Sequence, residues 1–427
     1  MVLYCGGIRK ILYGTIDKMK VINTLPKILL IFSEYLLYLL IIFLFIDQGE
    51  TFREVGIYTP SILLFLRALI SQENPVDIKN KIFILVIFLC FSGIIASIFS
   101  PEPYYSLKWF KKTYLKLFFV TLAFIYIFQT PQKLENLSNL FVFLTLLFSI
   151  LTIYEFYTKV FLNSYDFGTT IRKYIVPLEI FCLFIPCFIV TKKTKFLKII
   201  GLSLLLITLL AIIFTGSRGG WISVLSGIAV WLIGYTYITK ANIKKIVVVT
   251  VSMTVIIFIV ISICSPSYVK VKIEQLLKGY TSQRKEYVWP IAIESYKNLP
   301  LINKIFGNGL GRMTYLEDFK KYYINRFGKE PEELYSPHNV YLGTLYKQGI
   351  FGLTIFFALF FTSFKILFKS LKMEQSLKMK TFALSLIAVL SVFMIHGLVE
   401  DMRFNQLLLI IPLIGAYNGY LWKMKND

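Results

Sequence analysis

Residues 82–99 read IFILVIFLCFSGIIASIF, a run of 18 residues without a single charged side chain. A run of this length and composition predicts a membrane-crossing helix, because spanning the hydrocarbon core of a bilayer takes about 20 apolar residues. The whole chain has the same character, since 56% of its 427 residues are hydrophobic and 17% are aromatic. One soluble core could not hide that much apolar surface, so a water-soluble globular protein is excluded.

Similar apolar runs recur along the chain and predict an all-α polytopic membrane protein with about twelve transmembrane helices. The runs cover residues 28–46, 55–66, 82–99, 117–128, 137–153, 174–190, 197–214, 221–238, 246–264, 339–364, 382–399 and 404–421. The second and fourth runs are short, so we expect them to extend into flanking polar residues. The predicted organisation is an N-terminal membrane bundle (1–264), one large insert (265–337) between the ninth and tenth helices, and the C-terminal membrane helices (338–427).

The distribution of Lys and Arg predicts the orientation. Segments on the side of the N-terminus hold 23 of these residues, whereas the short segments on the other side hold 10. The positive-inside rule then places both termini in the cytoplasm and the insert on the opposite, outer side of the membrane. The net charge of +22 is explained largely by this topology and does not indicate a nucleic-acid partner.

A short motif on the predicted outer side, Thr215–Trp221 (TGSRGGW), connects the seventh and eighth spans. Two helices hold Arg218 close to the membrane, where an arginine without a partner is costly. The two glycines allow a ligand to approach the start of the eighth helix, whose dipole favours anions. A phosphate group is the expected guest, and the alternative is an arginine that only snorkels from the turn.

The insert contains further candidates. Arg284 precedes an amphipathic segment, and its forked guanidinium suits phosphate oxygens, so Arg218 and Arg284 together could hold a diphosphate. Alone, Arg284 is an ordinary surface charge. The stretch Gly307–Arg312 (GNGLGR) resembles a phosphate loop, but it has neither a preceding strand nor a following Walker lysine, so we interpret it as a tight turn. The spacing of Tyr315, Leu316, Phe319, Tyr322 and Tyr323 predicts a helix that lies on the membrane or caps the bundle.

Both histidines of the chain are candidates. His338 lies where the insert enters the tenth span, at a helix N-terminus that disfavours imidazolium, so it is expected to be neutral and able to accept a proton from a hydroxyl. A capping role is the alternative. His396 and Glu400 lie four residues apart and are expected to pair with each other on one helical face. A metal triad of His338, His396 and Glu400 has no supporting pattern, so no metal site is predicted.

In combination, these motifs resemble the O-antigen ligase and polymerase-like superfamily over roughly residues 197–405. The resemblance rests on these motifs: Ser217–Trp221, Arg284, the Gly307–Gly311 turn, His338–Leu342 and Gly349–Gly352. The resemblance implies an enzyme without metal or cofactor that transfers a glycan from undecaprenyl diphosphate to a sugar hydroxyl of lipid A-core at the periplasmic face, among membrane lipids. It implies that Arg218 and Arg284 bind the donor diphosphate and that His338 activates the acceptor hydroxyl.

Accessory roles are expected for six other residues of the predicted outer side. Lys108, Lys111 and Lys112 form a basic cluster on the outer side, where the positive-inside rule predicts few Lys and Arg, and they are candidate anion contacts. Arg312, His396 and Glu400 complete the set. The alternatives within the superfamily are an O-antigen polymerase and a protein-glycosylating ligase. A solute transporter is the alternative from another class, although its polar residues would lie near mid-bilayer instead of at the outer ends of spans.

Overall fold

A computed structural model describes residues 21–46, 49–71, 79–161, 172–240, 283–311, 313–328, 330–331, 336–401 and 404–426. Every regular element within these ranges is helical. In chain order they are α2 (Val21–Phe43), α3 (Glu50–Ser71), α4 (Lys81–Ile98), α5 (Pro103–Lys112), α6 (Tyr114–Ile127), α7 (Pro131–Glu155), η2 (Phe156–Phe161), η3 (Arg172–Tyr174), α8 (Ile175–Phe181), η4 (Cys182–Phe184), α9 (Ile185–Thr191), α10 (Lys195–Phe214), α11 (Arg218–Thr239), α14 (Gln283–Lys297), α15 (Leu301–Phe306), α16 (Met313–Phe327), α17 (Val340–Met373), α18 (Leu377–His396) and α19 (Phe404–Asn426).

The predicted class, an all-α polytopic membrane protein, is confirmed. Among the described residues, nine helices are long and apolar enough to cross a membrane: α2, α3, α4, α7, α10, α11, α17, α18 and α19. The predicted span at 117–128 corresponds to the shorter α6, and that at 174–190 is interrupted as α8, η4 and α9. Pro186 at the start of α9 lacks the N–H that would continue the α-helical ladder across this interruption. The ninth predicted span, 246–264, lies outside the described residues.

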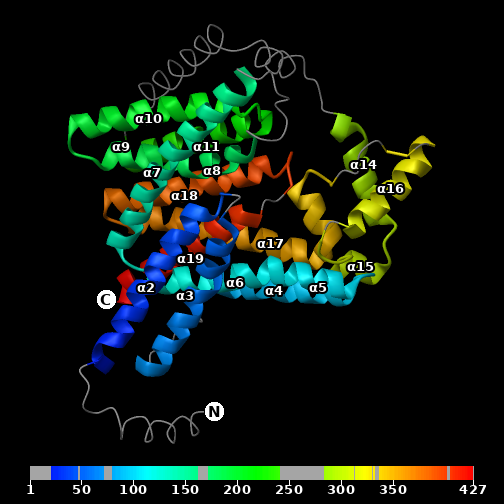
Figure 1. The fold of residues 1–427 in the computed structure, drawn as a ribbon, viewed down its shortest axis with the longest axis horizontal. Coiled ribbons are helices and arrows are strands. Elements are labelled where there is room, and N and C mark those ends of the chain that lie inside the picture. Colours follow the sequence, from blue (N-terminus) through cyan, green and yellow to red (C-terminus); the bar gives the residue numbers. More distant parts are fainter. Residues whose placement is uncertain are drawn as a thin grey trace, which may run out of the picture.

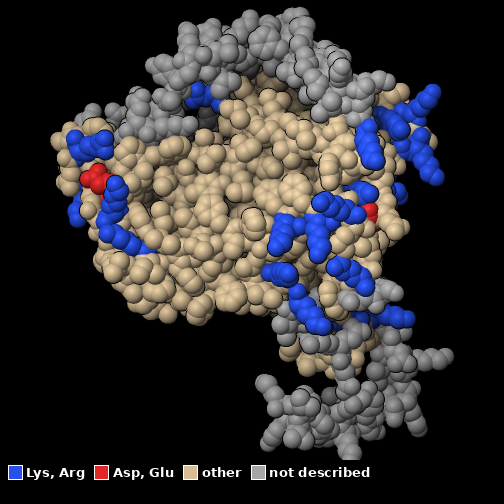
Figure 2. Space-filling view, turned by 180° about the vertical axis from the view of Figure 1, so that it is seen from behind, with Lys and Arg blue, Asp and Glu red and all other residues tan. Residues whose placement is uncertain are grey.

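The long helices α10, α17 and α18 run roughly along one direction, with the insert helices α14, α15 and α16 at one end and the C-terminus at the other (Figure 1). Helix α18 lies inside this arrangement. In its most apolar stretch 78% of the residues are buried, compared with 22% in that of α11. Between two groups of basic side chains, a broad surface carries no charge (Figure 2). Phe143, Ile233 and Phe361 are exposed apolar side chains, as expected of a surface that faces lipid.

The insert forms a small core of its own against the first turns of α17. Val288 and Ile291 of α14 pack with Phe319 of α16 and with Tyr346 of α17, and all four are almost completely buried. The predicted amphipathic helix is therefore present as α16, and its apolar face is covered by α14 and α17. The packing of α16 against α14 and α17 agrees with the expectation of a helix that caps the bundle.

The glycine-rich turn after α15 docks into a kink of α17. Gly307 (φ +100°) and Gly349 (φ +66°) both adopt left-handed backbone conformations. A Cβ on Gly307 would lie 2.2 Å from the carbonyl oxygen of Lys347, and one on Gly349 would lie 2.3 Å from that of Ile305. The amide of Asn308 donates to the carbonyl of Tyr346 at 3.0 Å. The turn interpretation of GNGLGR is thus confirmed, and its glycines permit contact between two backbones.

We expect Gly349→Ala to destabilise the protein by about 1–3 kcal/mol or more, because the new Cβ meets a backbone oxygen in a backbone conformation that L-residues avoid. Gly343→Ala on the same helix is the matched control, since nothing lies within 4 Å of the Cβ that it adds. That control should be neutral or slightly stabilising. Thermal unfolding of the purified protein in detergent provides the measurement. Equal midpoints for the two variants would show that the kink is not a constraint.

The predicted orientation is tested with cysteines placed at exposed lysines in a background from which the five native cysteines have been removed. Lys297→Cys on α14 should react with a membrane-impermeant maleimide in cells whose outer membrane alone is open, because the insert is predicted to be periplasmic. Lys193→Cys, between α9 and α10, should react only after the inner membrane is permeabilised. The reverse pattern would invert the topology.

Candidate active site

The segment that carries His338 is fastened to the end of α18 by hydrogen bonds. The amide of Val340 donates to the carbonyl of Gly397 at 2.8 Å. The side-chain amide of Asn339 donates to the carbonyl of Leu398 at 3.1 Å, while its oxygen caps α17 by accepting from the backbone amides of Tyr341 and Leu342. The hydroxyl of Tyr341 donates to the carbonyl of Met394 at 2.8 Å. The backbone beside His338 therefore has a fixed position.

His338 itself combines an unusual backbone with a defined partner. Its φ of 46° is left-handed, a conformation that costs a non-glycine residue about 1–2 kcal/mol and that recurs at functional sites. Its Nδ1 lies 3.0 Å from Oε1 of Glu400, and the imidazole is 18% exposed. An ionised carboxylate can only accept, so Nδ1 carries the hydrogen in the neutral ring and Nε2 presents a lone pair. This geometry orients Nε2 as a proton acceptor.

His396 and Glu400, the expected pair, each have a partner on another element. Helix α18 ends at His396, and the amide of Glu400 donates to the carbonyl of His396 at 3.0 Å in the turn that follows. Nδ1 of His396 lies 2.9 Å from Oε2 of Glu179 on α8. The three groups of the rejected metal triad are thus divided between two hydrogen-bonded pairs.

Glu179 is a functional-site candidate that the sequence reasoning missed. Its side chain is fully buried, and its other oxygen accepts from the hydroxyl of Ser223 on α11 at 3.2 Å. The signal was present in the sequence, because Glu179 is the only charged residue in the apolar run 174–190. An ionisable residue within a span is costly and marks a site by default.

The arginine motif packs against this buried pair. Ser217 caps α11 by accepting from the amide of Gly220 at 3.2 Å, which makes the half-buried Arg218 the first helical residue. A Cβ on Gly219 would lie 3.2 Å from Nε2 of His396, and one on Gly220 would lie 2.8 Å from a carboxylate oxygen of Glu179. The glycines therefore allow α11 to approach protein side chains, and this close approach brings Arg218 to the end of α18.

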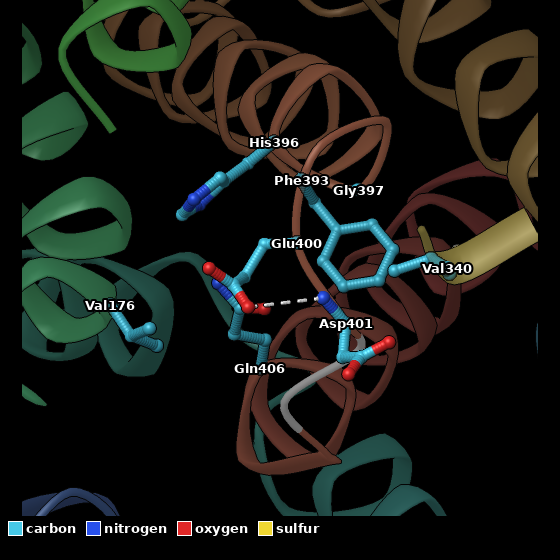
Figure 3. Close-up of a pocket in the computed structure, with 8 residues that line it drawn as sticks. All are labelled: Val176, Val340, Phe393, His396, Gly397, Glu400, Asp401 and Gln406. Carbon is cyan, nitrogen blue, oxygen red and sulfur yellow. Dashed lines mark hydrogen bonds between the residues drawn. The ribbon is translucent and has the colours of Figure 1, made fainter. Parts of the chain in front are cut away.

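A small pocket opens beside these groups, with an empty volume of about 220 Å³. It is lined by Val176, Val340, Phe393, His396, Gly397, Glu400, Asp401 and Gln406. The carboxylate of Glu400 and the side chain of Gln406 lie between Val176 and the end of α18 (Figure 3). Pockets that enclose a small-molecule ligand measure about 300–1,000 Å³. This one is too small to enclose a substrate.

The remaining predicted residues lie elsewhere or outside the described side chains. Lys108, Lys111 and Lys112 are exposed on α5, and that helix is joined to the glycine turn by the amide of Leu310, which donates to Ser106 at 2.6 Å. These lysines thus belong to the insert end of the protein. Arg284 is part of α14, but its side chain lies outside the description, as does all of Arg312.

Comparison with known proteins relates this geometry to a family. No curated protein matches the chain. The sequence profile of the O-antigen ligase family matches residues 202–357. This stretch contains the Arg218 motif, the insert and the segment from His338 into α17, whereas Glu179, His396 and Glu400 lie outside it. Over residues 202–357 the chain thus carries the sequence pattern of the O-antigen ligase family, and the resemblance inferred from its motifs is confirmed.

Proposed function

We propose that this protein is a ligase that transfers a glycan from undecaprenyl diphosphate to a sugar hydroxyl of lipid A-core, at the periplasmic face of the inner membrane. The family match supports the coarser statement, an O-antigen ligase-like or polymerase-like membrane glycosyltransferase. One observation carries the finer proposal. The end of α18 contacts both Val340, in the His338 segment, and Gly219, in the Arg218 motif, and this proximity supports assigning the proposed base and the proposed diphosphate-binding arginine to one site.

In the proposed reaction, Nε2 of His338 takes the proton from the acceptor hydroxyl. The acceptor oxygen forms a bond to the anomeric carbon of the donor glycan, and the bond between that carbon and the diphosphate oxygen breaks. The electron pair leaves with undecaprenyl diphosphate. Glu400 accepts the hydrogen bond from Nδ1 throughout and stabilises the imidazolium that forms.

Arg218 is proposed to bind the leaving diphosphate. Negative charge develops there as the bond breaks, and guanidinium groups that are already in place stabilise such charge without reorganisation. The N-terminal dipole of α11 adds to the positive potential at this residue. On the basis of the family resemblance, Arg284 is proposed as the second arginine that binds the diphosphate. The site so composed uses no metal or cofactor.

An O-antigen polymerase is the alternative within the family, and it would use the same base and the same donor site with a second lipid-linked glycan as acceptor. A deletion strain separates the two functions. Loss of a ligase leaves long lipid-linked polymer that is not attached to lipid A-core. Loss of a polymerase leaves single repeat units, which can still be attached.

A solute transporter is the second candidate, and one observation favours it. The apolar helical segment α8–η4–α9 carries the buried Glu179, and an ionisable group within an apolar span can mark a transport pathway. A transporter would depend on Glu179 but not on His338. The ligase depends on His338, and Glu179 then serves to hold His396 and α11 in place.

We expect His338→Ala to lower glycan transfer about 10²- to 10⁴-fold, the usual contribution of a general base. Glu400→Gln should reduce transfer less, because an amide still accepts from Nδ1 but stabilises the imidazolium poorly. His396→Ala is the comparison variant and should show a milder defect in transfer or a loss of thermal stability. Transfer is measured with purified protein and lipid-linked glycan, with and without chelator, which should have no effect. Near-normal activity of His338→Ala in folded protein would rule out the general-base role.

We also expect Arg218→Lys and Arg284→Lys to impair transfer even though both keep the charge, because an ammonium group cannot make the forked contact with diphosphate oxygens. Arg53→Lys on α3 is the control, since that guanidinium donates to the backbone carbonyl of Ile46. The rates are compared at equal amounts of inserted protein. Wild-type rates in both test variants would show that neither arginine is needed to bind the diphosphate, and Arg218 would then be only a turn residue and Arg284 only a surface charge.

A further inference from the structure

A second and larger hollow lies near the end of α17 that is distant from His338. Its empty volume is about 700 Å³, and it is formed where the start of α4 meets the ends of α17 and α19. Lys79, Asn80, Lys81, Ile366, Lys369, Ser370, Met373, Asn418, Leu421, Trp422 and Lys425 line it. The C-terminus lies at the left of Figure 1, and therefore at the right of Figure 2, which shows the molecule from behind. A group of basic side chains lies on that side of Figure 2. None of the residues discussed for glycan transfer belongs to this hollow.

The lining carries four lysines, and none of its residues is acidic among those that the structure describes. Of these, Lys425 lies in the last turn of its helix, where the helix dipole favours a cation. Lys79 and Lys81 are at the start of α4, where the dipole disfavours one. Four lysines thus line one hollow, and an anion bound there would be attracted by all of them.

Glu374, the acidic residue next to the lining in sequence, is already engaged. It is almost completely buried, and it accepts from the hydroxyl of Tyr420 at 2.6 Å. Its other oxygen accepts from the amides of Gln375 and Ser376, both at 2.9 Å. Both carboxylate oxygens of Glu374 thus accept hydrogen bonds from other groups of the chain, and Glu374 does not line the hollow.

The floor of the hollow is rigid and its wall is amphipathic. The side-chain amide of Asn80 donates to the carbonyl of Gly415 at 2.9 Å, and Asn418 donates to the oxygen of Asn80 at 3.1 Å, which ties α4 to α19. The ammonium group of Lys79 lies 5.5 Å from the ring centre of Trp422. Ile366, Met373 and Leu421 supply apolar surface beside the charges. Such a wall fits a molecule with an anionic head and an apolar chain.

We propose that this hollow binds the phosphate headgroup of an anionic phospholipid. The lysines bind the phosphate oxygens, Trp422 lies at the interface, and the apolar wall receives the first carbons of an acyl chain. The positive-inside prediction places the site in the cytoplasmic leaflet, on the side opposite to the proposed transfer reaction. A lipid bound there holds together the ends of three helices, α4, α17 and α19.

The test compares two double variants of equal charge. Lys369→Gln with Lys425→Gln removes two lining lysines, whereas Lys372→Gln with Lys423→Gln removes two exposed lysines from the same helix ends that do not line the hollow. The full chain in detergent is titrated with short-chain phosphatidylglycerol, with short-chain phosphatidylcholine and with inorganic phosphate. The shift of each protein's own unfolding midpoint reports binding.

Phosphatidylglycerol should stabilise the wild type and the control variant, and its apparent affinity should fall about 30-fold in the lining variant. Phosphatidylcholine and inorganic phosphate should have little effect on any of them. An equal response to phosphatidylcholine would overturn the requirement for an anionic head, and an equal response to inorganic phosphate would assign the site to a free anion. Equal phosphatidylglycerol affinities of the two double variants would refute the site. If the lining variant does not fold, each single variant is titrated in its place.

Discussion

The hydrogen bond between His396 and the buried Glu179 is the contact on which the candidate site depends. It joins α8 to α18, and Ser223 brings α11 to the same carboxylate. A buried carboxyl group that loses its partner costs several kcal/mol, so these helices are strongly held at this point. Because the Arg218 motif begins α11 and the His338 segment is fastened just beyond His396, both proposed functional groups are positioned from one place.

Glycines make two close contacts of this fold possible. Gly219 and Gly220 allow α11 to lie directly on the His396–Glu179 pair, with no room for a Cβ. Gly307 and Gly349 allow the turn after α15 to enter the kink of α17, where backbone meets backbone. The first contact positions Arg218. The second connects the insert to the helix whose first turn follows His338, so the insert and the site share one rigid element.

The two ends of the bundle differ in chemistry. Near the end of α18 lie two imidazole–carboxylate pairs, of which His396–Glu179 is buried and His338–Glu400 is partly exposed, and a small pocket opens beside them. At the end of α17 and α19, lysines surround a larger hollow with an apolar wall. Both arise where helices end, because interior residues of a membrane helix must satisfy their backbone internally and only the ends can turn polar groups toward a substrate or headgroup.

The sequence by itself determined the helical membrane class, most of the spans, the amphipathic helix α16 and the superfamily resemblance. Each of these follows from local composition or spacing, which sequence reports directly. The interruption of the sixth span and the docking of the glycine turn were not predicted, because they depend on what packs against each segment. Gly349 illustrates this, since its neighbour Ile305 is far away in the sequence.

The tertiary structure alone decided which charged groups are partners. From the sequence, His396 and Glu400 were the expected pair, because a continuous helix would bring them together. The helix ends at His396, and the side chain that meets it, Glu179, is separated from it by more than two hundred residues. Spacing along the chain constrains contacts only within one element. Pairing between elements depends on how helices pack, and that is set by side-chain volumes over the whole bundle.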